Sequence, residues 1–189
     1  QAYERDQLLV IPMILILVFI VLVLLLRSLL APFLLLSSVV LSFFSAMGAA
    51  WLVFENIFGM SGLDFSVFLY SFLFLVALGV DYNIFLVSRA REESALMSGK
   101  VDQPTRRGMI KALGATGGVI TSAGILLAAV FAVLGVLPLL ALFQIGIIVG
   151  IGVLIDTLLV RTVVVPATAF IAGDKFWWPR KKLTAGKFA

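Results

Sequence analysis

The residue with the clearest chemical potential in this 189-residue sequence is Asp81, an acid inside an apolar segment. Sixteen uncharged residues precede it from Phe65, and seven follow it to Ser88. A carboxylate near the centre of a bilayer costs about 2.5–3.5 kcal/mol, so such acids usually serve a function. Because no cation is expected at this depth, Asp81 is predicted to be either protonated or paired with a group outside the chain. Both states suit a proton carrier, and a hydrogen bond that joins two helices is the alternative.

Three hydroxyl side chains could support Asp81. Tyr82 follows about 100° further around the helix, and its phenol could donate to a carboxylate on a neighbouring helix. The alternative for Tyr82 is simple aromatic packing. Thr121 and Ser122 could also bond into the interior, although a bond back to the preceding helical turn is equally open to them.

A second acid, Asp156, precedes Arg161 by five residues. Both are expected near the membrane surface, at the inner end of the last span. Asp156 is therefore predicted to be a partly hydrated acid, paired with a basic residue and ranked below Asp81 as a functional group.

The composition indicates that these acids belong to an integral membrane protein. Apolar residues make up 62% of the sequence and charged residues 13%, against roughly 45–50% apolar in soluble domains. A soluble fold of this size could not bury that much apolar surface, and disordered chains are polar. Because the sequence has no Cys and no His, we expect no metal site and no cofactor.

Long uncharged runs predict an all-α integral membrane protein with a bundle of five transmembrane helices. The run from Ala112 to Ile155 has forty-four residues, which is too long for one crossing, and Gly135 and Pro138 offer the break. The transmembrane bundle is predicted over 8–172, with spans at about 8–26, 29–54, 65–88, 109–135 and 140–165.

The basic residues predict the orientation. With the N-terminus outside and the C-terminus in the cytoplasm, thirteen of the fourteen Lys and Arg residues fall on the cytoplasmic side, as the positive-inside rule requires. The net charge of +4 is therefore a signal of topology, and we expect no nucleic-acid partner. Residues 173–189 form a basic juxtamembrane tail, in which Trp177 and Trp178 are expected to anchor at the lipid headgroups; specific lipid recognition is the alternative.

Small residues predict where helices touch. Gly114 with Gly118, and Gly146 with Gly150, are pairs four residues apart on the fourth and fifth spans. Such pairs allow close approach of helix backbones in lipid. These two spans are therefore expected inside the bundle, whereas the first span, nearly all Leu, Ile and Val, is expected to meet lipid.

One segment of the sequence resembles a known family. The run Ala-Leu-Gly-Val-Asp81-Tyr82-Asn-Ile-Phe-Leu-Val-Ser-Arg89-Ala-Arg91-Glu-Glu93 is similar to the Asp-Tyr helix and following loop of the MmpL family, a group within the resistance–nodulation–division superfamily. The stretch from Thr121 through Asp156 to Pro166 also resembles the last two helices of that family.

The resemblance implies a partial exporter. Members have twelve spans in two halves, each with a large extracytoplasmic domain, and use the proton gradient to export lipids, glycolipids, siderophores or drugs across the bacterial plasma membrane. The five spans would be the last five, and residues 1–7 would be the trailing edge of the second extracytoplasmic domain. Asp81 and Tyr82 would be the proton relay, with the N-terminal half of the transporter as partner and protons as the coupling ion. Membrane lipids and a hydrophobic or lipid-like substrate would be the other partners.

Two other functions are open at this point. Two membrane acids could share a proton in an intramembrane aspartyl protease, although this sequence has Leu-Gly-Val-Asp81 where such enzymes have Gly-x-Gly-Asp. The chain could also be a non-catalytic assembly or protein-translocation subunit of the same superfamily, although those subunits lack the Ser-Arg-x-Arg-Glu-Glu loop.

Overall fold

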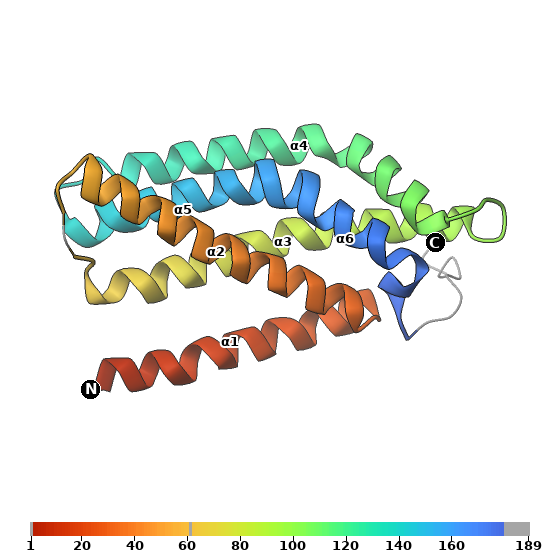
Figure 1. Cartoon of the computed structure of the whole chain (residues 1–189), viewed down its shortest axis with the longest axis horizontal. Coiled ribbons are helices and arrows are strands. Elements are labelled where there is room, and N and C mark those ends of the chain that lie inside the picture. Colours follow the sequence, from red (N-terminus) through yellow and green to blue (C-terminus); the bar gives the residue numbers. More distant parts are fainter. Residues whose placement is uncertain (1, 61, 180–189) are drawn as a thin grey trace.

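The chain folds into a bundle of five long helices. The computed structural model describes residues 2–60 and 62–179. Its first four helices are α1 (Ala2–Leu26), α2 (Leu30–Asn56), α3 (Phe65–Met97) and α4 (Pro104–Leu134). The fifth is continuous through α5 (Leu140–Ile155), the π-helix η1 (Asp156–Val164) and α6 (Val165–Ala172), and ends in the 3₁₀ turn η2 (Gly173–Trp177). No strand occurs in these ranges, and all five helices are long and apolar enough to cross a membrane (Figure 1).

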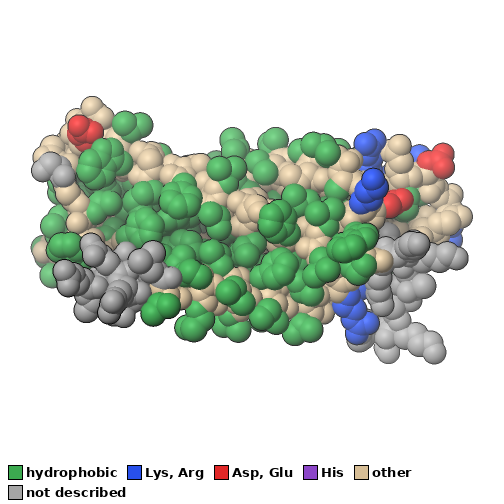
Figure 2. Space-filling model, turned by 60° about the horizontal axis from the view of Figure 1, so that its bottom comes forward, with side chains coloured by type: hydrophobic (Ala, Val, Ile, Leu, Met, Phe, Trp, Pro, Cys, Tyr) green, Lys and Arg blue, Asp and Glu red, His purple; other side chains and the backbone are tan. Residues whose placement is uncertain are grey.

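The outer surface of the bundle is apolar between two polar ends. Leu9, Leu24, Phe33 and Leu41 are each 60% or more exposed, as lipid-facing residues are. In Figure 2 the Lys and Arg side chains in view gather at one end of the molecule. We call this end, where Arg27, the 98–103 turn and η2 lie, the basic end.

α1 is the most peripheral helix (Figure 1). Only 11% of its apolar window from Leu9 to Leu26 is buried, against 61% for the fifth helix. Of its residues 9–26, whose burial the structure describes, only Leu22 and Leu26 are fully buried in the core. This agrees with the expectation that the first span meets lipid.

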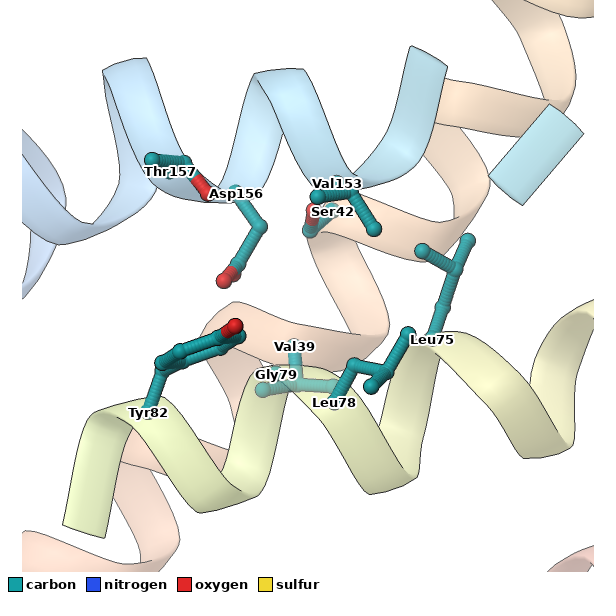
Figure 3. A pocket seen from close by; sticks show the side chains of 9 residues that line it. All are labelled: Val39, Ser42, Leu75, Leu78, Gly79, Tyr82, Val153, Asp156 and Thr157. Carbon is teal, nitrogen blue, oxygen red and sulfur yellow. The ribbon is translucent and has the colours of Figure 1, made fainter. Parts of the chain in front are cut away.

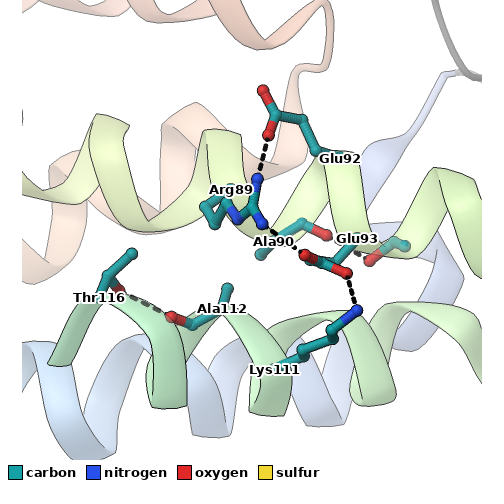
Figure 4. A network of polar contacts seen from close by, with 8 residues as sticks. Arg89, Ala90, Glu92, Glu93, Lys111, Ala112 and Thr116 are labelled. Atoms are coloured by element: carbon teal, nitrogen blue, oxygen red, sulfur yellow. Dashed lines mark hydrogen bonds and ion pairs between the residues drawn. The ribbon is translucent and has the colours of Figure 1, made fainter.

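α3 and α4 extend beyond the predicted spans at the basic end. α3 continues nine residues past Ser88 to Met97, and α4 begins at Pro104 rather than at 109. The extension is held by ion pairs, because Arg89 donates to Glu92 at 3.0 Å and to Glu93 at 2.7 Å. Lys111 on α4 reaches the other oxygen of Glu93 at 2.7 Å, so the buried Glu93 joins the two helices (Figure 4).

Of the four glycines expected at helix contacts, Gly146 makes a close contact, and Gly124 makes another that was not expected. A Cβ placed on Gly124 would collide with the Thr157 side chain, and one on Gly146 would lie 2.6 Å from the Phe131 carbonyl oxygen. On Gly150 a Cβ would make only ordinary contacts, at 3.7 Å or more. Within the described residues, Gly114 and Gly118 have no atom within 4 Å of such a Cβ. The close approach of α4 to the fifth helix therefore lies at Gly124, more than one turn after the expected pair of Gly114 and Gly118.

The segment after α6 folds back into the protein. Trp177 is 2% exposed, and its indole Nε1 donates to Thr105 Oγ1 at 3.1 Å. Thr105 in turn donates to Asp174 at 2.6 Å, and the backbone N–H of Leu29 donates to the Trp178 carbonyl at 2.9 Å. Trp177 is thus a core residue and not the interfacial anchor that the sequence suggested, because its polar atom finds a partner inside the bundle. Trp178 is 57% exposed and remains available to headgroups; the basic residues at 180–189 lie outside the described residues.

Candidate functional site

The Asp-Tyr pair of α3 places its two side chains in different surroundings. Asp81 is exposed on the side of the described bundle, whereas Tyr82 is half-buried. Figure 3 shows Tyr82 extending from α3 toward Asp156 on the fifth helix. The 100° step between neighbouring helical residues explains this separation.

Opposite Tyr82 lies a buried ion pair. Arg161 Nη2 donates to Asp156 Oδ2 at 2.7 Å, and the two residues are 2% and 5% exposed. The predicted pairing of Asp156 with a basic residue is confirmed, whereas the prediction of a partly hydrated acid is wrong because both residues are buried. Removing two charges from water is costly unless they are paired, and here the pair is complete within one helix.

The π-helix is what brings these two side chains together. In a regular α-helix, residues five apart point about 140° away from each other. η1 runs from Asp156 to Val164, and its i→i+5 turn brings Asp156 and Arg161 onto one face. Single π turns inside α-helices often mark functional sites.

Arg161 also contacts the Asp-Tyr helix directly. Its guanidinium carbon lies 4.6 Å from the centroid of the Tyr82 ring, within the range of a cation–π interaction. A cation therefore lies at the depth of Tyr82, which corrects the expectation that this depth holds no Lys, Arg or His. The sequence held a signal for it, since twelve uncharged residues separate Arg161 from Asp174, or about 18 Å of helix.

A small cavity of about 10 Å³ lies between α2, α3 and the fifth helix beside this pair. This is room for about one water molecule. Its lining residues are Val39, Ser42, Leu75, Leu78, Gly79, Tyr82, Val153, Asp156 and Thr157 (Figure 3). Gly79 matters here, because a Cβ on it would lie 3.2 Å from Val39 and 3.7 Å from Asp156 Oδ1. The glycine of the Gly-x-Asp-Tyr motif thus lets α3 approach α2 and the acid.

Buried polar atoms without a hydrogen-bond partner in the described ranges concentrate around the ion pair. Four of the eight such atoms belong to the pair and its neighbour, namely Asp156 Oδ1, Thr157 Oγ1, Arg161 Nε and Arg161 Nη1. The other four are both amide atoms of Asn83, Ser71 Oγ, and Glu93 Oε2, which is ion-paired with Lys111. Asn83 is fully buried and follows Tyr82 directly, and no pattern in the sequence distinguishes it as a site residue. The site is therefore polar well beyond the single acid.

Thr121 and Ser122 differ in their surroundings. Thr121 lines a second cavity of about 20 Å³ together with Thr157 and Arg161. Ser122 is exposed and donates to the Val119 carbonyl at 3.0 Å, which is the local back-bond. Thr121 therefore lies near the ion pair, and Ser122 does not.

The two membrane acids Asp81 and Asp156 are not placed to share one proton in the described chain. Asp156 is bonded to Arg161, while Asp81 is exposed on another helix. The arrangement of an aspartyl protease is therefore not favoured.

Sequence comparisons place the chain among known proteins. The MMPL family profile matches residues 1–188. The chain belongs to the MMPL family. The match covers all five helices, so the bundle is a multi-pass bacterial membrane domain of this family.

Several relatives are similar along nearly the whole chain. A membrane protein of Streptomyces coelicolor is 56% identical over 95% of the chain, which is 24% of that protein. The apo-petrobactin exporter of Bacillus anthracis is 44% identical over 96% of the chain and 24% of its own length. The acyltrehalose exporter MmpL10 of Mycobacterium tuberculosis is 42% identical over 94% of the chain and 17% of its length. The chain thus spans a quarter or less of these relatives, two of which are named as exporters.

Proposed function

We propose that the chain is the C-terminal membrane part of a proton-driven exporter of lipids or other hydrophobic small molecules. The observation that carries this proposal is the contact between Tyr82 and Arg161, 4.6 Å apart. It connects the exposed acid of α3 to a buried ion pair on the fifth helix.

The proposed cycle starts at Asp81. When Asp81 binds a proton, one negative charge disappears beside Tyr82. The attraction that holds the Arg161 side chain toward α3 then weakens, and the balance between Tyr82 and Asp156 as partners of Arg161 changes. Because Asp156 and Arg161 sit in a π turn, a small change in this balance can shift the fifth helix relative to α3.

The remaining parts of the proposal concern partners and orientation. The exposed face of Asp81 would meet the N-terminal half of the transporter, and the basic end would lie in the cytoplasm. The names of two relatives, an acyltrehalose exporter and an apo-petrobactin exporter, support a lipid or siderophore as cargo.

The test uses the whole protein that contains this chain, reconstituted in proteoliposomes. Asp81→Asn removes the titrating proton and keeps the side-chain size, so we expect proton-driven export to fall at least about a hundredfold. Asp102→Asn, at an exposed acid in the 98–103 turn, is the matched control and should export normally. Normal proton-coupled export by a well-folded Asp81→Asn protein would show that Asp81 carries no proton.

A further inference from the structure

Two adjoining hollows run along the surface between α4 and α6 at the basic end. The outer hollow has a volume of about 180 Å³ and includes Thr105, Arg106 and Asp174 in its lining. The inner hollow has about 270 Å³ and an apolar lining of Met109, Ile110, Leu113, Gly114, Pro166 and Phe170. Phe170 lines both, so the two form one groove that is polar outside and apolar inside.

The length of the groove follows from the helices. Arg106 and Gly114 are eight residues apart on α4, which is about 12 Å along the axis. On the facing wall, Pro166 and Phe170 are one turn apart. Gly114 leaves the inner hollow open, since a Cβ on it would meet no atom within 4 Å in the described chain.

Arg106 is held at the mouth of this groove with donors to spare. Its Nε donates to the Phe170 carbonyl at 3.1 Å, and its Nη1 donates to Gln103 at 2.8 Å. A guanidinium has five N–H donors, so three of them have no hydrogen-bond partner among the described residues.

The charge around the mouth is positive. Among the described residues, Arg106 and Asp174 line the outer hollow, and the Asp174 carboxylate already accepts a bond from Thr105. Arg107 and Lys175, their neighbours in the sequence, are exposed at the same end but lie outside this lining. In the preceding turn, Lys100 and Asp102 offset each other. An anionic group is therefore the ligand that this mouth favours.

We propose that the groove between α4 and α6 binds one anionic phospholipid of the surrounding membrane, its phosphate on Arg106 and its acyl chain along Ile110, Gly114 and Pro166. The combination of a fixed arginine and a contiguous apolar channel matches an amphiphile better than a soluble anion or an apolar helix. This lipid is a resident of the bundle and not the exported cargo, so the inference is independent of proton coupling at Asp81.

The test measures lipid binding to the purified whole protein by native mass spectrometry. Phosphatidylglycerol and phosphatidylcholine with identical acyl chains are the probes, and we expect phosphatidylglycerol to bind about tenfold more tightly. Arg106→Gln should abolish this preference, because hydrogen bonds to a charged group account for a factor of that size. Arg107→Gln removes the same charge one residue along and should change binding less than about twofold.

Two further variants keep the result interpretable. Arg106→Lys retains the charge and should keep part of the preference. Gly114→Leu fills the inner hollow without changing any charge, and it should weaken the binding of both lipids by similar factors. Equal binding of the two lipids, or equal effects of Arg106→Gln and Arg107→Gln in folded protein, would overturn the headgroup site. Unchanged binding by Gly114→Leu would overturn the acyl channel.

Discussion

Breaking the ion pair between Asp156 and Arg161 from one side should destabilise the bundle strongly. Arg161→Met leaves the Asp156 carboxylate, which is 5% exposed, without its cation. Removal of one partner from a buried pair costs about 3–5 kcal/mol of unfolding free energy. Asp156→Leu should cost a similar amount, because it strands the guanidinium instead.

The double variant, which removes both charges, should lose much less unfolding free energy than either single variant. At 2.7 Å between Nη2 and Oδ2, the gross attraction is about 6 kcal/mol with an effective dielectric constant of about 20. Desolvation of two ions, several kcal/mol each, offsets most of this. The unfolding free energy of the double variant Asp156→Leu/Arg161→Met should therefore lie within about 2 kcal/mol of that of the parent protein. The lost contact with Tyr82 accounts for about 0.5–2 kcal/mol of this difference.

The assay is denaturant unfolding of the purified protein in bicelles, followed by circular dichroism, with a double-mutant cycle over the two positions. We expect a coupling of at least about 2 kcal/mol between them, and Arg107→Met at an exposed position as control should change little. Additive single effects, or a cost below about 1 kcal/mol for Arg161→Met, would refute the buried pair. Export should be lost in the double variant even though stability returns, since Tyr82 then has no cation to contact.

Two further predictions concern single helices. Gly124→Ala should lower the unfolding free energy by about 1–3 kcal/mol, because its Cβ collides with Thr157; Gly118→Ala, with open space around it, should be neutral or stabilising in the same unfolding assay. Asp64 caps the N-terminus of α3, and hydrogen bonds from the Ser66 hydroxyl and then its backbone N–H lower the pKa of Asp64 below the ordinary 3.8. Because the pKa of Asp64 is lower in the folded protein than in the unfolded chain, the cap stabilises the protein above pH 3.8, and this stabilisation is lost as the pH falls from there through the folded pKa. If the unfolding free energy of Asp64→Asn depends on pH in the same way as that of the parent protein, this prediction is contradicted.

Part of the site could be predicted from the sequence. Asp81 is conspicuous because charge is so costly in an apolar run, and Tyr82 follows from its place beside it. Asp156 and Arg161 are predicted near the membrane surface because they lie at the inner end of the last span, and their spacing of five would put them on different faces of a regular α-helix. Only the π turn brings them together, and nothing in residues 156–164 announces that turn.

The packing was harder to predict than the spans. The two glycine pairs are equivalent in sequence, yet Gly146 touches the backbone around Phe131 while Gly114 opens on a groove. Trp177 likewise reads as a headgroup anchor until Thr105 is found next to its indole. These outcomes depend on how each helix is rotated about its axis.

The sequence by itself determined the number of helices, their place in a membrane and the gathering of basic residues at one end. A bilayer imposes these features directly, through the length of each uncharged run and the cost of moving charge across lipid. The tertiary structure decided which residues meet: Tyr82 with Arg161, Gly124 with Thr157, and α4 with α6 around a groove. Since lipid and protein interior are both apolar, the two sides of a membrane helix look alike in sequence, and only contact between helices distinguishes them.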